Sequence, residues 1–284
     1  MNTDNVILRR LTDDDFDDLL NAVNTSFADY IVPFKLNEEQ LKFKILSEDI
    51  VMQWSVGVFL DNKLIAFIMH GVRTLDSKRV VYNAGTGVLP DYRGKGFVGK
   101  MYEFINPFLK QNEVKELVLE VIASNNSAIR AYEKDGFTVR RKLLCFGGKV
   151  ETTINHSNVC LLPLNKLLWA DFVAFWDIQP SWQSYINSMD NLQPDALGAF
   201  IEGKLVGYVL FSKEMKRVYQ IAVSKNHRRK GIASHLIKEA YQATNAEILQ
   251  VNNIDSTCES IKLFLERQGL VNDINQFEMM KSLF

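Results

Sequence analysis

The feature that most constrains the fold of this chain is an internal repeat. Residues 87–96 read GVLPDYRGKG, residues 222–231 read AVSKNHRRKG, and the two segments align without a gap. Arg93 of the first segment corresponds to Arg228 of the second, an offset of 135 residues (228 − 93) in a chain of 284. Self-similarity at this spacing is what duplication of one domain of about 140 residues produces. The chain is therefore expected to fold as the same module twice.

The residues around both copies also agree. Each copy follows a run of β-branched and aromatic residues, at 79–82 and 217–221, and precedes apolar residues at helical spacing. A second apolar run then leads in each half to a helix that ends before a glycine, Gly136 in the first half and Gly269 in the second. Each half is therefore predicted to form a strand, the loop, a helix, a strand and a helix.

Earlier in each half, the pattern predicts a β-hairpin. Residues 55–60 and 64–69 form the first, and residues 196–201 and 205–211 form the second, each around a short polar turn. The polar segment 151–158 has no apolar period and is the best linker, which places the boundary near residues 150–157. The predicted domains are 1–150 and 158–284.

Composition excludes several classes of protein. Hydrophobic residues make up 47% of the chain and charged residues 24%, as in ordinary globular proteins, which argues against disorder. A net charge of −1 implies no broad basic face, so we expect no nucleic-acid partner. Cys145, Cys160 and Cys258 lie far apart and outside metal-binding spacings, so neither a disulfide framework nor a metal site is expected.

The N-terminus and the length of the apolar runs predict the cellular compartment of the protein. The N-terminus lacks a basic start followed by an apolar run, and no stretch approaches the roughly 18 apolar residues of a membrane span. We therefore expect a cytoplasmic protein, a monomer or a homodimer, with no membrane partner. The aromatic residues between 169 and 182 are expected to be core or interdomain packing.

The repeated loop has a chemical interpretation of its own. Glycines let the backbone approach a ligand, amides at a helix N-terminus point outward, and Arg93 and Lys95 add positive charge, so the loop suits a pyrophosphate. A P-loop is excluded because Gly96 stands where Ser or Thr must follow the lysine. A dinucleotide fingerprint at Gly94, Gly96 and Gly99 is not reproduced in the second half, so the shared element is Arg-x-x-Gly.

At these residues the sequence resembles the GNAT superfamily of acyl-CoA-dependent N-acyltransferases, twice over and along nearly the whole chain. The family's pyrophosphate loop, Gln/Arg-x-x-Gly-x-Gly/Ala, is matched by residues 228–233. Residues 93–98 match it except that Val98 stands where glycine or alanine is usual. The resemblance implies an α/β fold with two tandem domains, each a central mixed β-sheet flanked by helices.

The resemblance also implies a set of cofactor-binding residues for acetyl-CoA. The pyrophosphate would lie on the two loops, the pantetheine arm would meet the backbone of the preceding strand, and an asparagine side chain would contact that arm. In this sequence the residues are Val88, Arg93, Gly94, Lys95, Gly96, Phe97, Val98, Gly99, Asn125, Val223, Arg228, Arg229, Lys230, Gly231, Ile232 and Ala233.

Four further residues are candidates for catalysis or substrate binding in the first half. The resemblance implies that the hydroxyl of Tyr132 protonates the departing CoA thiolate. Glu120 stands among apolar strand residues, where an ionised carboxylate is costly unless it is paired or used, so it is either a base or a structural hydrogen-bond partner of a neighbouring strand or loop. Asp29 and the adjacent Tyr30 are substrate-side candidates, and the alternative for Asp29 is a solvated acid at a helix end.

The two halves differ at these positions. Gln250 replaces Glu120, and Phe264 or Leu265 replaces Tyr132, depending on the placement of one inserted residue. A positioned acid or base is typically worth about 10² to 10⁴ in rate, so the second half is expected to be degenerate and the first half catalytic. The opposite assignment stays open, because residues 228–233 are the better match to the pyrophosphate loop.

The sequence therefore predicts an acetyl-CoA-dependent N-acetyltransferase without a metal. A primary amine, of a small molecule or a peptide, would attack the thioester directly in a ternary complex. The alternative is a non-catalytic module that binds CoA or acyl-CoA, or that is structural only.

Overall fold

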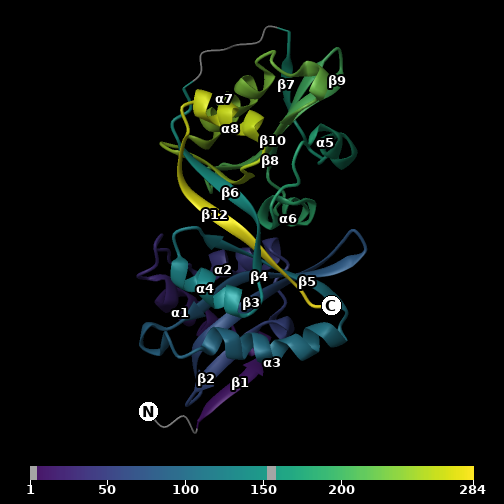
Figure 1. The fold of residues 1–284 in the computed structure, drawn as a ribbon. Coiled ribbons are helices and arrows are strands. Elements are labelled where there is room, and N and C mark those ends of the chain that lie inside the picture. The colour runs from purple at the N-terminus through teal and green to yellow at the C-terminus, as the bar shows by residue number, and fades with distance from the viewer. Residues whose placement is uncertain (1–4, 152–157) are drawn as a thin grey trace. The chain divides into compact units, whose positions relative to one another are not determined.

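A computed structural model describes residues 5–151 and 158–284, and the chain divides into two compact units. Unit 1 consists of Met1–Arg140 together with Phe277–Phe284, and unit 2 of Arg141–Gln276. The predicted boundary near residues 150–157 falls largely on 152–157, which lie outside the described residues. Figure 1 shows the elements of each unit in chain order.

Unit 1 is built on a mixed β-sheet. Its strands follow the order β1, β2, β3, β4, β5 and the end of β12, with β4 and β5 parallel and the pairs from β1 to β4 antiparallel. The elements are β1 (Val6–Arg10), α1 (Phe16–Phe27), α2 (Glu38–Ser47), β2 (Val56–Leu60), β3 (Lys63–Leu75), β4 (Lys78–Val88), α3 (Phe97–Gln111), β5 (Val114–Ile122) and α4 (Asn126–Lys134).

Unit 2 repeats this order of elements. Its strands follow the order β7, β8, β9, β10, β11 and β6, with β10 and β11 parallel and the other pairs antiparallel. The elements are β6 (Thr138–Gly148), β7 (Cys160–Pro163), α5 (Trp169–Phe175), α6 (Ile186–Leu192), β8 (Asp195–Ile201), β9 (Lys204–Ser212), β10 (Arg217–Val223), α7 (Ile232–Thr244), β11 (Leu249–Asp255), α8 (Glu259–Arg267) and β12 (Val271–Ser282). Mixed sheets flanked by helices confirm the predicted fold class.

Both predicted hairpins are present. The turn between β2 and β3 has left-handed backbone at Asp61 and Asn62, and the turn between β8 and β9 has it at Glu202 and Gly203. Two consecutive residues with positive φ match the right-handed twist of the flanking strands, which is why such short turns close hairpins.

The last strand of each repeat crosses from one unit to the other. Residues 141–148 of β6 belong to unit 2, where they pair with β11, and residues 277–282 of β12 belong to unit 1. In unit 1, Met279 and Leu283 are buried in the core, and the Leu283 N–H donates to the Lys115 carbonyl at 3.1 Å. Each unit is thus completed by residues from the other half of the sequence.

The parallel strands separate toward the loops. The register of β4 with β5 runs from Arg79 to Asn83, although β4 continues to Val88. The register of β10 with β11 covers Arg217 and Val218, although β10 continues to Val223. Each unit therefore has a gap between its two parallel strands, directly before the repeated loop.

The helices of unit 2 cover both faces of its sheet (Figure 1). One face packs against α7 and α8 through a cluster that includes Leu236 and Leu265, and the other packs against α5 and α6 through a cluster that includes Phe172 and Met189. In unit 1 the corresponding core contains residues of α3 and α4, such as Met101 and Tyr132.

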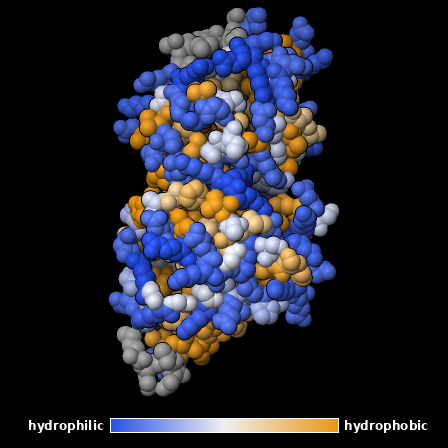
Figure 2. Space-filling model, viewed as in Figure 1, coloured by the Kyte–Doolittle hydropathy of each residue, from blue (hydrophilic) through white to orange (hydrophobic). Residues whose placement is uncertain are grey.

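Hydrophilic side chains cover most of the face seen in Figure 2, and hydrophobic side chains gather in small groups between them. Among residues 5–151 and 158–284, no helix is long and apolar enough to span a bilayer. The same residues contain no cluster of histidine, cysteine and acidic side chains suited to a metal ion.

Candidate functional site

The two repeated loops have the same backbone conformation. Gly94 and Gly96 have φ of 74° and 75°, and the matching Arg229 and Gly231 have φ of 61° and 79°. Gly96 and Gly231 are the residues that directly precede helices α3 and α7. Left-handed residues just before a helix turn backbone N–H groups outward, and such groups favour an anion. Both loops therefore have the geometry that the sequence predicted for a pyrophosphate.

Arg93 connects the first loop to the end of α1. Its guanidinium donates to both carboxylate oxygens of Asp29 at 2.7 Å, to the Ser26 carbonyl at 3.0 Å and to the Val88 carbonyl at 3.3 Å. These hydrogen bonds raise the pKa of Arg93 and lower that of the Asp29 carboxyl. Asp29, a predicted substrate residue, is thus the ion-pair partner of a predicted cofactor residue.

Arg228 makes the same set of contacts in unit 2. It donates to Asp177 at 2.7 Å, to the Phe175 carbonyl at 3.1 Å and to the Val223 carbonyl at 3.0 Å. Asp177 and Phe175 lie at the end of α5, as Asp29 and Ser26 lie at the end of α1. The shared arginine therefore fixes the loop against the end of α1 in unit 1 and of α5 in unit 2, and the outward backbone N–H groups remain for the ligand.

Unit 2 contains a cavity of about 580 Å³ that begins at its loop. Six of the predicted cofactor residues line it: Val223, Arg228, Arg229, Gly231, Ile232 and Ala233. Lys230 is not among the lining residues, and its ammonium donates to the Asn226 carbonyl at 3.3 Å. Because the cavity is lined by residues of both β10 and β11, it occupies the gap between these strands.

In unit 1, polar side chains of β4, α3 and α4 form a cluster beside the corresponding gap. The Asn83 amide donates to the Tyr102 hydroxyl at 2.8 Å and to the Thr86 hydroxyl at 2.7 Å. Burial raises the pKa of the Tyr132 hydroxyl to about 12, although the neighbouring Thr86 and Asn83 side chains act to lower it. At neutral pH, Tyr132 is therefore protonated and part of a buried polar cluster.

Asn125 and Tyr30 meet beside this cluster. The Asn125 amide donates to the Tyr30 hydroxyl at 3.2 Å, and its carbonyl oxygen accepts from the Ala128 N–H at 3.2 Å, which caps α4. The structure thus brings together Tyr30, Asn125 and Tyr132 at the end of the β4–β5 gap. Phe97 is buried at the start of α3, whereas Lys95 donates to the Asp91 carbonyl.

The two halves of the chain match one family model, described as the acetyltransferase (GNAT) family, at residues 16–137 and 161–270. These two regions cover most of the sequence. The chain belongs to the GNAT acetyltransferase family. The predicted resemblance and the predicted tandem arrangement are confirmed.

Solved structures with this GNAT fold match nearly the whole chain at low identity. A GCN5-related N-acetyltransferase from Sphaerobacter thermophilus is 16% identical with a TM-score of 0.73, over 99% of this chain and 96% of that one. A tandem GNAT protein from the clavulanic acid biosynthesis pathway is 11% identical with a TM-score of 0.73, over 98% and 99%. At these identities the likeness concerns the fold. No curated protein matches the sequence.

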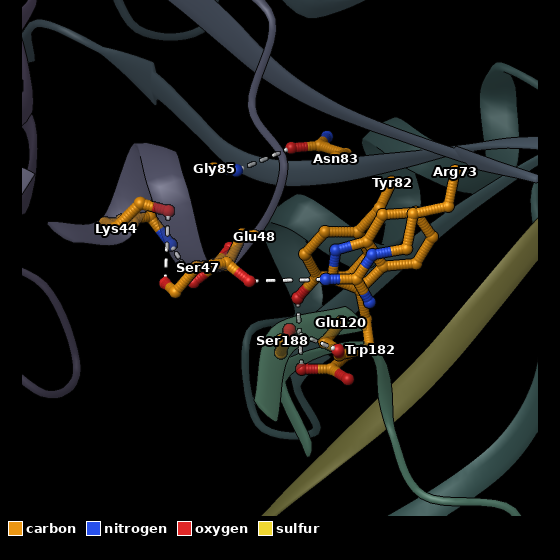
Figure 3. A network of polar contacts seen from close by, with 10 residues as sticks. All are labelled: Lys44, Ser47, Glu48, Arg73, Tyr82, Asn83, Gly85, Glu120, Trp182 and Ser188. Atoms are coloured by element: carbon orange, nitrogen blue, oxygen red, sulfur yellow. Dashed lines mark hydrogen bonds and ion pairs between the residues drawn. The ribbon is translucent and has the colours of Figure 1, made fainter. Parts of the chain in front are cut away.

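Glu120, the predicted base of the first GNAT region, is hydrogen-bonded to the adjacent strand. The Tyr82 hydroxyl on β4 donates to the Glu120 carboxylate at 3.2 Å (Figure 3). Burial and the nearby carboxylate raise the pKa of Tyr82 well above its ordinary value. Successive strand residues point to opposite faces, and Leu119 and Val121 pack with Tyr132. Glu120 and Tyr132 therefore lie on opposite faces of the sheet.

The second GNAT region has different residues at the family positions on α8. Cys258 precedes α8 as Asn125 precedes α4, because each stands eleven residues before the glycine that ends the helix (269 − 258 and 136 − 125). By the same count, Leu265 corresponds to Tyr132, and it is buried in the core. Phe264 and Cys258 line the cavity. Sequence reasoning missed Cys258, although counting back from the glycine finds it.

A chain of hydrogen bonds forms one wall of the cavity. The Trp176 indole N–H donates to the Tyr208 hydroxyl at 2.6 Å, Tyr208 donates to the Gln220 side-chain oxygen at 2.7 Å, and the Gln220 amide donates to the Ser184 carbonyl at 2.5 Å. All four residues line the cavity. No local signal in the sequence predicts this wall, since its members come from three separate segments.

Proposed function

We propose that this protein is an acetyl-CoA-dependent N-acetyltransferase whose acetyl-CoA site lies in unit 2. The observation that carries the proposal is the cavity, which connects the loop before α7 with the gap between β10 and β11. A thioester in that gap could be approached from the opposite face of the sheet. The acceptor is a primary amine of a small molecule or a peptide, which attacks directly in a ternary complex.

The residues of unit 2 suit the parts of this co-substrate. Outward N–H groups at the start of α7, with Arg229 and His227 beside them, favour the pyrophosphate. The apolar side chains of Ile232, Val251 and Phe264 suit the pantetheine arm. No metal is needed for this binding, since the loop supplies both the donors and the positive charge.

Acetyl transfer imposes further requirements on the cavity. The amine nitrogen forms a bond with the thioester carbon, the carbon–sulfur bond breaks, the nitrogen loses a proton and the thiolate gains one. An alkyl amine of pKa about 10.4 must first lose a proton, at a cost of about 4.6 kcal/mol at pH 7. Leu265 has no hydroxyl at the position of Tyr132, so the thiolate would take its proton from another lining group or from water.

A second candidate site is the gap of unit 1, where Tyr132 and Asn125 match the family pattern. Tyr132 is protonated at neutral pH, as a general acid must be. Use of this site would require Tyr132 of α4 to turn toward the thiolate from the polar side chains beside it, Asn83 and Thr86 of β4.

Matched glycine variants distinguish the two sites. Gly231→Asp places a carboxylate at the start of α7, and Gly96→Asp does the same at α3, with similar left-handed backbone at both positions. Titration calorimetry with acetyl-CoA should show at least a 100-fold loss of affinity for Gly231→Asp and little change for Gly96→Asp. The reverse result would move the site to unit 1.

Activity is measured separately, as release of free thiol from acetyl-CoA with a panel of primary amines. Turnover that falls with Gly231→Asp supports the proposal. Acetyl-CoA binding without thiol release for any amine would favour the alternative function, a non-catalytic module that binds acyl-CoA.

A further inference from the structure

We propose that Asn252 binds the acceptor amine in unit 2, and that this amine enters in its neutral form and is one of low basicity. This inference rests on the proposed function, because it assumes that acetyl-CoA occupies the gap between β10 and β11. It adds the residue that contacts the acceptor and the chemical class of the acceptor.

Strand pairing identifies Asn252 as the counterpart of Glu120. β4 and β5 are paired as far as Leu119, so Glu120 is the first residue of β5 in the gap of unit 1. β10 and β11 are paired as far as Val251, so Asn252 is the first residue of β11 in the gap of unit 2. The strand partners of Leu119 and Val251 stand at positions 83 and 218, which differ by the same 135 residues (218 − 83) as the two loops.

A β-bulge in each unit supports this alignment. The register between β3 and β4 skips Ala84, and the register between β9 and β10 skips Tyr219, again 135 residues apart (219 − 84). Gln250, which the sequence alone matches to Glu120, stands two residues before Asn252, is exposed and does not line the cavity. The predicted match of Gln250 to Glu120 is therefore wrong.

The side-chain amide of Asn252 is available to a ligand. Asn252 is half-buried and lines the cavity, and its amide makes no hydrogen bond within the part of the chain that the structure describes. Its polar atoms are not among the unpartnered ones that are shielded from solvent, so a ligand can reach them. The next side chain, Asn253, is engaged elsewhere, since its oxygen accepts from the Gln276 amide at 2.9 Å.

The orientation of β11 places Asn252 on the acceptor side of the sheet. Val251 belongs to the cluster on the α7–α8 face, so the residue after it faces the α5–α6 side. The cavity reaches both faces, because it is lined by Ile232 of the first cluster and by Tyr219 of the cluster on the α5–α6 side. With the pantetheine arm against α7 and α8, the amine would approach from the side of Asn252.

The charged groups of the cavity lie away from the two strands that flank the gap. Asp177, after α5, is paired with Arg228 at 2.7 Å, and the backbone N–H of Glu151 donates to the Gln268 carbonyl at the end of α8. No carboxylate on the described lining comes from β10 or β11. The charged residues and the histidine of this lining are Glu151, Asp177, His227, Arg228, Arg229 and Arg267.

A neutral amide at this position determines which form of the amine can react. The Asn252 oxygen can accept a hydrogen bond from one N–H of the amine, but an amide does not take up a proton near neutral pH. The nitrogen forms its bond with the thioester carbon, the carbon–sulfur bond breaks, and water takes the proton from the nitrogen and supplies one to the thiolate. At pH 7 an amine of pKa about 8 is about one-tenth neutral, whereas one of pKa about 10.4 is neutral in about 1 part in 2,500. The gap therefore suits the weaker base.

Two amines of different basicity test the role of Asn252. Glycinamide has an α-amino group of pKa about 8, and propylamine is an alkyl amine of pKa about 10.4. In the wild type, kcat/KM for propylamine should rise about tenfold per pH unit between pH 6 and 9, since only the neutral amine reacts. Asn252→Ala should lower kcat/KM for glycinamide about tenfold and leave acetyl-CoA affinity, measured by calorimetry, within twofold. Retained affinity also shows that the variant is folded.

A second variant and a matched control use the pH profile. Asn252→Asp keeps the size of the side chain but adds a carboxylate that can pair with propylammonium and take its proton. This variant should raise kcat/KM for propylamine at least tenfold at pH 7 and make it nearly independent of pH between 6 and 9. Gln250→Asp places the same carboxylate two residues earlier, outside the cavity, and should leave the profile unchanged.

Three results would overturn the inference. A flat propylamine profile in the wild type would reveal a base elsewhere in the cavity. Glycinamide kinetics within twofold of the wild type in Asn252→Ala would remove the role of Asn252, and a tenfold loss of acetyl-CoA affinity in that variant would assign the residue to the co-substrate. Failure of the proposed function would show differently, as absence of acetyl-CoA binding in the wild-type protein.

Discussion

Units 1 and 2 share a scaffold but differ in the space between their parallel strands. In both, an arginine fixes the loop to the end of an earlier helix, α1 or α5, and left-handed residues precede the following helix. In unit 1, Asn83 and Thr86 of β4 form a buried polar cluster with Tyr132 of α4 beside the gap, whereas unit 2 has a cavity of about 580 Å³ in its gap. The loop motif is therefore evidence for the shared fold alone. Side chains a few residues away from the loop determine whether a ligand fits.

The largest expected effect concerns the part of unit 1 that comes from the end of the chain. Deleting residues 277–284 removes Met279 and Leu283, 0% and 5% exposed, from its core. At about 1.5–3 kcal/mol for each buried side chain, and with the loss of a strand, unit 1 should lose about 5 kcal/mol or more. Hydrogen exchange resolved by peptide would show the loss across β4 and β5.

Deletion of Phe284 alone is the matched control for this truncation. This residue is 71% exposed, so its removal should change the stability of unit 1 by less than about 1 kcal/mol. Equal protection of β4 and β5 in the two deletion variants would show that β12 does not complete the sheet of unit 1.

The second prediction concerns acid stability. His70 is fully buried in unit 1, and this burial lowers its pKa to about 4 from 6.5. The unfolded chain therefore binds a proton that the folded unit excludes, so stability is lost as the pH falls from about 6.5 toward 4. The shift of about 2.5 pKa units corresponds to about 3 kcal/mol.

Urea unfolding at pH 7 and pH 4.5 checks this expectation. The loss should be smaller in His70→Gln, which can still donate to the Trp54 carbonyl that His70 contacts at 2.8 Å. An equal loss in the wild type and the variant would mean that His70 does not cause the acid sensitivity.

The third prediction uses Tyr132, whose pKa of about 12 lies about two units above the ordinary value of 10.0. The folded state keeps the phenol neutral, so the stability from this group is complete below pH 10 and is lost as the pH rises through 12. Tyr132→Phe should remove about 2 kcal/mol of this alkaline loss, measured as the difference in urea stability between pH 9 and pH 12.

The same variant also tests which of the two units carries out acetyl transfer. If acetyl transfer occurs in unit 2, Tyr132→Phe should keep thiol release within about twofold of the wild type. A loss of about 10² or more would place the chemistry in unit 1, as the sequence alone predicted.

Much of the scaffold could be predicted from the sequence because it depends on local signals. Gly136 and Gly269 end their helices, and the turns at Asp61 and Gly203 close their hairpins. The open or filled state of each gap could not be predicted, since it depends on partners far apart in sequence. Neither a motif nor a period links Trp176 to Tyr208. The residues of β12 likewise do not indicate that the end of this strand belongs to unit 1.

The smallest expected effect concerns the residue before α8. Asn125 caps α4 by accepting from the Ala128 N–H, whereas Cys258, at the matching position, makes no side-chain cap. Cys258→Asn should therefore stabilise unit 2 by about 0.5–1 kcal/mol, measured by urea unfolding at pH 7. The reciprocal variant, Asn125→Cys, should destabilise unit 1 by a similar amount. If both changes proved neutral, the match between the two cap positions would be one of sequence spacing alone. If Cys258→Asn stabilised unit 2 and also changed acetyl-CoA affinity, the residue would contact the co-substrate in the cavity it lines.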